Sequence, residues 1–252
     1  MNLHCLGTSG YHPSEARQTS CYFLAEDGVV LDAGSGIFRL TPLIQTDRLD
    51  ILLSHAHLDH TMGLTFLHDV LRGREFAEVR VWAAADKLAV IQACLFQQLI
   101  FPAMIPVRWM VVPPGEAFEV GTRRPLRVET RNQEHPGGSL AYRIRWPGDG
   151  KTLVYATDTV GDTSAEAQRW MRAADLLVHE CSFRDREQDW AMQTGHCWTS
   201  RAAGIGRSAG VKRLLLAHIN PLETGDDPID LAQARGIFPE TVVAADGDVV
   251  PF

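Results

Sequence analysis

Three histidines and one aspartate fall within six consecutive positions, in the run His55-Ala56-His57-Leu58-Asp59-His60. The preceding Ile51-Leu52-Leu53 is typical of a buried strand, and the leucine spacing after the run predicts a helix over about His60–Arg72. Residues two apart in extended chain point the same way, so the first two histidines aim at one point beyond the strand. The aspartate and the last histidine aim at a second point. Imidazole and carboxylate suit zinc, manganese or iron, so the run predicts metal binding.

Four ligands at two points do not complete two metal sites, so other parts of the chain must contribute. Three candidates come directly after predicted strands: His135, Asp158 and His218. A single His or Asp in such a position is usually a cap or a turn residue. Beside the first motif, the three together predict the missing ligands.

The elements that position these residues follow from hydrophobic periodicity and turn residues. Strands are expected at Asn2–Leu6, Ser20–Ala25, Val29–Asp32, Asp50–Ser54, Val79–Trp82, Leu126–Thr130, Ser139–Trp146, Thr152–Thr157, Leu176–His179 and Leu214–Ala217. Further helices are expected at Asp86–Leu99, Ser164–Ala173, Ser200–Ala209 and Pro228–Arg235. This order indicates an α/β (α+β) protein with mixed sheets. No linker or repeat interrupts the chain, so we expect a single domain over residues 1–252.

Composition limits the possible classes of protein. The chain has 252 residues, 45% of them hydrophobic, and a formal net charge of -7, so no extended nucleic-acid-binding surface is expected. Five cysteines without a CxxC pair are typical of buried thiols in a cytoplasmic protein. No signal peptide is recognised, and polar residues and prolines interrupt the most apolar region, Leu88–Pro113, so no membrane span is expected.

These motifs resemble the metallo-β-lactamase superfamily, in which an HxHxDH run is followed by a His, an Asp and a His. The resemblance extends from Leu6-Gly7-Thr8 to His218. It implies a four-layer αβ/βα sandwich and a hydrolase with two divalent metal ions, zinc first, with manganese or iron as alternatives. By this resemblance His55, His57 and His135 hold one metal, Asp59, His60 and His218 hold the other, and Asp158 bridges both.

Two further segments resemble the ribonuclease Z-like branch of this superfamily. Val178-His179-Glu180-Cys181 is similar to its His-Glu-Ala-Thr segment, and Gly195-His196-Cys197-Trp198-Thr199 to its Gly-His-Ser-Thr segment. The resemblance implies that Glu180 and His196 form a proton relay near the leaving group. A helix cap and an ordinary loop histidine are the structural alternatives. His135–Tyr142 is similar to a third segment of the branch, and Ser139 and Tyr142 are candidates for substrate binding or for packing.

One departure from the pattern of the ribonuclease Z-like branch narrows the expected function further. Only 22 residues separate His135 from Asp158, whereas short bacterial enzymes that process transfer RNA carry a long arm in this interval. The chain therefore resembles armless relatives such as a cyclic phosphodiesterase. We expect a phosphodiesterase that acts on a small or cyclic phosphodiester. A hydroxide shared by the two metals would attack phosphorus, Asp59 would orient it, and His196 would act as the general acid.

Two other classes of function remain open at this stage. The same metals can serve hydrolysis of thioesters or lactones, and the same ligands can hold iron in a non-hydrolytic protein of a cofactor pathway. The apolar, proline-broken segment Leu95–Met110 is either core, a lid over the metals or a contact in a homodimer.

Overall fold

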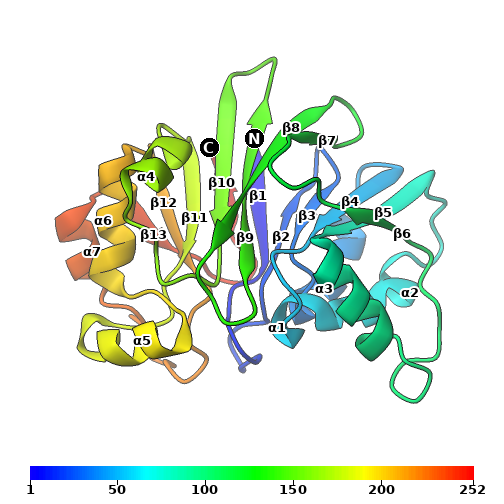
Figure 1. The fold of residues 1–252 in the computed structure, drawn as a ribbon, viewed down its shortest axis with the longest axis horizontal. Helices are drawn as coiled ribbons and strands as arrows, with labels where there is room; N and C mark the ends of the chain where they lie inside the picture. Colours follow the sequence, from blue (N-terminus) through cyan, green and yellow to red (C-terminus); the bar gives the residue numbers. More distant parts are fainter.

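Two seven-stranded sheets lie face to face at the centre of the computed structural model, which describes residues 1–252 (Figure 1). The first sheet has the order β14-β1-β2-β3-β4-β5-β6, and the second has the order β13-β12-β11-β10-β9-β8-β7. In chain order the strands are β1 (Asn2–Gly7), β2 (Cys21–Leu24), β3 (Val29–Leu31), β4 (Arg48–Leu52), β5 (Glu78–Ala83), β6 (Arg108–Val111), β7 (Phe118–Val120), β8 (Leu126–Gln133), β9 (Ser139–Trp146), β10 (Lys151–Ala156), β11 (Leu176–Glu180), β12 (Leu214–Ala217), β13 (Thr241–Val243) and β14 (Val249–Pro251).

Helices cover the outer faces of both sheets. The first sheet is covered by η1 (Ser35–Leu43), α1 (Leu58–Thr61), η2 (Met62–Phe66), α2 (Leu67–Val70), α3 (Ala85–Val90) and η3 (Ile91–Leu95). Along the second half of the chain lie α4 (Ala165–Met171), η4 (Asp185–Glu187), α5 (Gln188–Thr194), α6 (Thr199–Ala209) and α7 (Leu231–Ile237). The result is the predicted four-layer αβ/βα sandwich.

Three apolar clusters hold these layers together. A cluster of 23 buried residues from both sheets, including Tyr22, Trp146 and Tyr155, fills the space between them. A second cluster packs the first sheet against its helices, and a third packs the other sheet against α4, α6 and α7. Because strand residues alternate between faces, each sheet contributes to two of these clusters.

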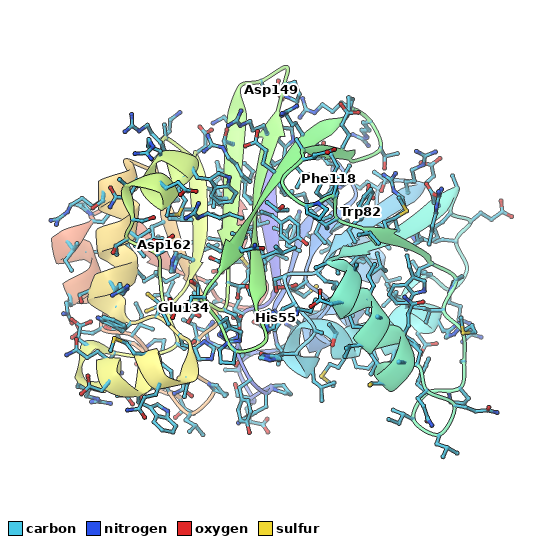
Figure 2. All side chains as sticks on the ribbon, in the orientation of Figure 1. His55, Trp82, Phe118, Glu134, Asp149 and Asp162 are labelled. Atoms are coloured by element: carbon cyan, nitrogen blue, oxygen red, sulfur yellow. The ribbon has the colours of Figure 1, made fainter.

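Each sheet contains one run of parallel strands, and these runs determine where the loops gather. Strands β3 to β6 are parallel, and so are β10 to β13. The carboxyl ends of parallel strands meet at one edge, so the loops that follow β4, β10, β11 and β12 are brought close together. Figure 2 shows His55, which follows β4, at the lower edge, and Asp149, in the β9–β10 turn, at the opposite end.

The predicted helix His60–Arg72 is not continuous. It divides into α1, the 3₁₀ helix η2 and α2, and the interruption contains Gly63. The Gly63 N–H donates to the Ala33 carbonyl at 2.8 Å, and a Cβ at this position would lie 2.2 Å from the Gly34 oxygen. This close contact with the loop that follows β3 overrides the regular helical pattern. Predicted strands mostly differ from the observed ones by one to three residues at their ends.

The segment Leu95–Met110 is only partly a core segment. Phe96, Phe101 and Trp109 pack against the second cluster, whereas Leu99 and Met104 are 90% and 76% exposed. The predicted helix Asp86–Leu99 accordingly ends at Leu95, before these exposed positions. No helix of the structure has the length and hydropathy needed to span a membrane.

Candidate metal centre

All seven predicted ligands come together at the edge where the parallel strands of both sheets end. They are His55, His57, Asp59, His60, His135, Asp158 and His218. The first four follow β4, whereas His135 precedes β9, Asp158 follows β10 and His218 follows β12. The centre therefore takes ligands from both sheets.

The first cluster contains His55, His57, His135 and Asp158, whose ligand atoms all lie within 4.8 Å of one another. His57 Nδ1 lies 3.3 Å from His135 Nε2. Asp158 Oδ2 lies 3.4 Å from His135 Nε2 and 3.6 Å from His55 Nε2. Three imidazoles and a carboxylate thus surround one point.

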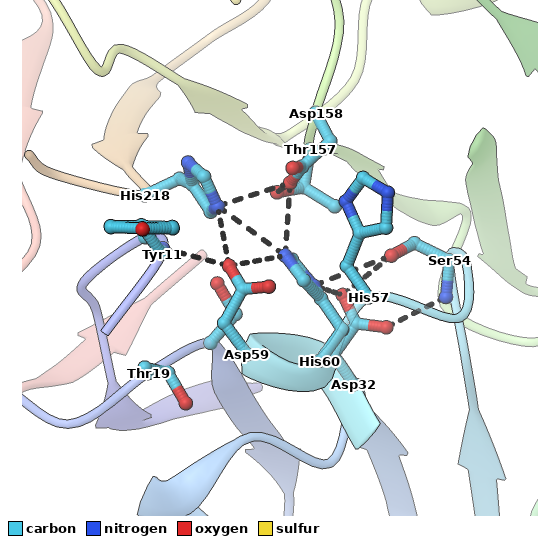
Figure 3. A network of polar contacts seen from close by, with 12 residues as sticks. Tyr11, Thr19, Asp32, Ser54, His57, Asp59, His60, Thr157, Asp158 and His218 are labelled. Atoms are coloured by element: carbon cyan, nitrogen blue, oxygen red, sulfur yellow. Dashed lines mark hydrogen bonds and ion pairs between the residues drawn. The ribbon is translucent and has the colours of Figure 1, made fainter. Parts of the chain in front are cut away.

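The second cluster contains Asp59, His60, His218 and the other oxygen of Asp158 (Figure 3). His60 Nε2 lies 3.1 Å from Asp158 Oδ1, 3.2 Å from Asp59 Oδ2 and 3.3 Å from His218 Nε2. Because Asp158 directs one oxygen toward each cluster, it has the geometry of a carboxylate that bridges two cations.

The donor atoms fit metal ions better than they fit one another. His55 Nε2 is buried and has no hydrogen-bond partner, although an unpaired buried polar atom is costly. The close nitrogen pairs, His57 with His135 and His60 with His218, can each share at most one proton if both rings are neutral. One divalent cation in each cluster would satisfy these nitrogens, and the nitrogen-rich donor set suits zinc.

The far nitrogens of four histidines are already hydrogen-bonded, which leaves the near nitrogens for a metal. The contacts are His55 Nδ1 to Ser54 Oγ at 3.0 Å, His60 Nδ1 to Asp32 Oδ2 at 2.8 Å, His135 Nδ1 to the Gly195 carbonyl at 2.9 Å and His218 Nδ1 to Ser182 Oγ at 2.9 Å. These contacts fix the rotation of each ring and the nitrogen that it directs toward the centre.

Three of the side chains that make these contacts, Asp32, Ser54 and Ser182, are not among the site residues predicted from sequence. Asp32 is completely buried and also accepts hydrogen bonds from Tyr155 Oη at 2.6 Å and from the Ser54 backbone N–H at 2.6 Å. Its position directly after a buried strand is the same signal that identified Asp158. Ser182 carries no such signal, since its contact with His218 joins residues far apart in the sequence.

The electrostatics of the centre favour cations. Burial lowers the pKa of His55 well below its ordinary value, so this imidazole stays neutral, as a ligand must. Burial also acts to lower the pKa of His60, but the carboxylates of Asp158, Asp59 and Asp32 raise it well above its ordinary value. The same carboxylates attract a divalent cation.

Beside the second cluster lies the predicted pair of Glu180 and His196. His196 Nδ1 is 3.0 Å from Glu180 Oε1, and Glu180 is completely buried at the end of β11. Glu180 also accepts hydrogen bonds from the backbone N–H groups of Thr159 and Cys197 and from the Ser182 hydroxyl. With four donors around it, this carboxylate is a hydrogen-bond acceptor rather than a metal ligand.

The charge of the pair follows from its surroundings. Burial acts to lower the pKa of His196, but the Glu180 carboxylate raises it to about 9. In turn burial acts to raise the pKa of Glu180, and the nearby His196 lowers it. The two groups therefore form an ion pair at neutral pH, with His196 protonated.

The two candidate substrate residues have different surroundings. Ser139 is 4% exposed, lines a cavity beside Ser54 and donates to the Thr157 carbonyl at 3.1 Å. Tyr142 is completely buried between the sheets, and its hydroxyl donates to the Leu53 carbonyl at 2.6 Å. The structure therefore does not support a substrate contact for Tyr142, because its polar atom is used to satisfy the core.

Unusual backbone geometry is concentrated at this centre. Four of the six non-glycine residues with positive φ are Tyr11, Asp32, Asp158 and His218, with φ between 47° and 59°. Such conformations are strained and persist where the surrounding structure fixes them. Gly10 shows how tight the packing is, because a Cβ there would lie 2.3 Å from the His218 ring.

The fold and these clusters define a metallo-β-lactamase-type metal centre, and comparisons with known proteins agree. A model described as the beta-lactamase superfamily domain matches residues 28–219, so the chain belongs to this superfamily. Ribonuclease Z of Synechococcus sp. (strain WH7803) is 38% identical over 310 aligned positions, which cover 98% of this chain and 94% of that enzyme. Ribonuclease Z of Bradyrhizobium sp. (strain ORS 278) is 30% identical over 96% of this chain and 97% of its own length.

A solved structure shares the complete fold. The short form of human tRNase Z has a TM-score of 0.79 at 20% identity, and the match covers 100% of this chain and 99% of that chain. The alignment with the Synechococcus enzyme is longer than this chain's 252 residues, so that relative contains residues that are absent here. Within the superfamily the chain is a ribonuclease Z-like, metal-dependent hydrolase.

Proposed function

We propose that this hydrolase is a phosphodiesterase with a two-metal centre and that it acts on a small or cyclic phosphodiester. His55, His57 and His135 would hold one divalent metal, Asp59, His60 and His218 the other, and Asp158 both. Zinc is the first candidate, with manganese and iron as alternatives. The observation that carries the proposal is the ion pair of Glu180 and His196, placed beside the second cluster.

The pair matters because of the leaving group. An alkoxide that leaves phosphorus is strongly basic and benefits from a proton, whereas the thiolate that leaves a thioester is stable near neutral pH. His196 is held by Glu180 through Nδ1, and its ring stacks on His218 at a centroid distance of 5.3 Å. An acid fixed at the edge of the centre favours esters of alcohols over thioesters.

The residues of this chain then have separate roles. Bound divalent metals would supply Lewis-acid activation of water and neutralise charge on the phosphoryl oxygens. Asp59, whose Oδ2 accepts the Tyr11 backbone N–H at 2.8 Å, orients the attacking water. As the water oxygen bonds to phosphorus, the water loses one proton to solvent, the bond to the leaving oxygen breaks, and that oxygen takes the proton of His196.

The short interval between His135 and Asp158 favours a small substrate. It is filled by β9, β10 and the four-residue turn between them, Pro147–Gly150, so no arm projects from it. The ribonuclease Z relatives make RNA 3′ ends the alternative substrate. A precursor transfer RNA must therefore be assayed beside the small phosphodiesters.

The test compares leaving groups in a His196→Ala variant. We expect unchanged metal content and a loss of about 10²–10⁴-fold in kcat/KM on alkyl phosphodiesters, with a smaller loss on p-nitrophenyl esters. His68→Ala is the control, because this exposed histidine on α2 contacts Phe101 rather than the centre. Equal losses on both ester types would contradict the acid role, and turnover of thioesters alone would contradict the phosphodiesterase.

A further inference from the structure

A cavity of about 410 Å³ lies beside the proposed acid, between His196 and helix α5. Its lining combines the imidazoles of His196 and His218 with Tyr11, Phe183 and Trp190. A second cavity, of about 180 Å³, lies on the other side of the centre beside His55 and His57. Apart from these two histidines, the second lining contains no aromatic residue and includes Lys87.

The aromatic lining is open to solvent as well as to the centre. Tyr11 and Trp190 are 82% and 58% exposed, and Leu222, also in the lining, is 77% exposed. Three large apolar side chains gathered around one cavity are unusual on a soluble surface and mark a place where a ligand removes them from water.

The cavity is rigidly connected to the centre. Tyr11 has φ of 59°, and its backbone N–H donates to Asp59 Oδ2 at 2.8 Å, as Figure 3 shows. On the opposite side, the His196 ring lies 6.1 Å from the ring of Phe183 and stacks on His218. The rings of Phe183 and His218 thus lie beside His196, the residue that would deliver the proton.

We infer that this cavity binds a flat ring on the alcohol that leaves phosphorus. The substrate class is then phosphodiesters whose leaving alcohol carries an aromatic or heteroaromatic ring. This inference rests on the proposed function, since it takes His196 as the acid for that alcohol. Trp190 and Tyr11 are the specificity-determining residues. Flat rings stack on aromatic side chains largely regardless of which polar groups the rings carry.

The first experiment compares two substrates, methyl benzyl phosphate and methyl cyclohexylmethyl phosphate, by release of the larger alcohol. We expect kcat/KM to favour the benzyl ester at least about tenfold, and Trp190→Ala to lower this ratio about tenfold, the scale of one stacking contact. Trp190→Phe should restore most of the ratio. Dividing the two rates within each variant removes differences in folding and metal content.

Met192→Ala is the matched control. Met192 lies on the same helix and is 54% exposed, similar to Trp190, but it does not line the cavity. We expect it to leave both rates unchanged. If Met192→Ala changes the ratio as much as Trp190→Ala does, the effect belongs to helix α5 as a whole and the inference is wrong.

A binding measurement separates this inference from the proposed function. Calorimetry on the metal-loaded protein should show that benzyl phosphate binds more tightly than cyclohexylmethyl phosphate, and that Trp190→Ala removes the difference. The inference is wrong if both diesters are hydrolysed, the two monoesters bind equally, and Trp190→Ala leaves the ratio of the two kcat/KM values unchanged. The proposed phosphodiesterase activity would then still stand. Selective binding of benzyl phosphate without turnover of any phosphodiester overturns the proposed function and the leaving-alcohol assignment, and supports only a ring-binding cavity.

Discussion

Replacement of Asp32 by Asn tests whether a buried carboxylate outside the metal clusters controls metal affinity. Asp32 Oδ2 accepts hydrogen bonds from His60 Nδ1 at 2.8 Å, Tyr155 Oη at 2.6 Å and Ser54 Oγ at 2.8 Å. In Asp32→Asn an NH₂ group can take the place of this oxygen, and an NH₂ group donates but does not accept.

The loss of affinity follows from the tautomer of His60. With a carboxylate at position 32, the ring proton stays on Nδ1 and the lone pair of Nε2 faces Asp59 and Asp158. An amide NH₂ favours a proton-free Nδ1, which transfers the ring proton to Nε2 and blocks the metal. We expect affinity for one metal equivalent to fall about 10–100-fold, or about 1.4–2.8 kcal/mol.

Asp50→Asn is the control for general destabilisation. Asp50 is also completely buried and also has four donors, from two Arg80 nitrogens, the Trp82 indole and the Gly121 backbone N–H. It contacts no residue of the centre, so the same change of charge should lower the free energy of unfolding without lowering metal affinity.

The assay is competition with a chelator of known affinity, together with metal analysis of the protein as isolated. Wild-type protein should bind two equivalents, and Asp32→Asn should release one of them at a lower chelator concentration. Two results would refute the reasoning: equal affinity in Asp32→Asn and wild type, or an equal loss of affinity in Asp50→Asn.

Three further predictions follow from the described contacts. Gly10→Ala should displace the His218 ring and lower metal content with little change in the circular dichroism spectrum; full metal content would show that the loop yields instead. Asp158→Asn should weaken both metal sites, which two-phase chelator titration measures, and loss at one site alone would contradict the bridging role. Trp146→Ala should lower the free energy of unfolding by about 3–5 kcal/mol in urea titrations, because the indole is fully buried and donates to Asp27 at 2.9 Å; a loss below about 1 kcal/mol would contradict its core role.

The sequence predicted the arrangement of the centre better than its supporting contacts. Candidates such as Asp158 and His218 could be identified because parallel strands end at a common edge, and a polar residue directly after a buried strand marks that edge. Asp32 follows the observed strand β3 in the same way, but the sequence predicted it as the last residue of that strand, Val29–Asp32. The contact between Ser182 and His218 depends on how β11 and β12 pair, which no local pattern contains.

The same limit explains the helices. The leucine spacing after His60 predicted one helix, whereas Gly63 interrupts it because its backbone packs against Ala33 and Gly34. Tyr142 was a substrate candidate because of a motif, and its burial between the sheets gives it a structural role instead. The ligand roles and the substrate class stay predictions until metal content and turnover are measured.

The origin of the ligands in both sheets has a consequence for how the protein acquires its metals. Each cluster joins the loop after β4 to loops of the second sheet, so neither half alone forms a complete coordination sphere. During folding, high-affinity uptake must therefore follow docking of the two halves, whose contacts are far apart along the chain and slow to form. Once bound, the ions cross-link the two sheets. The rate of metal release then measures how rarely the two halves separate.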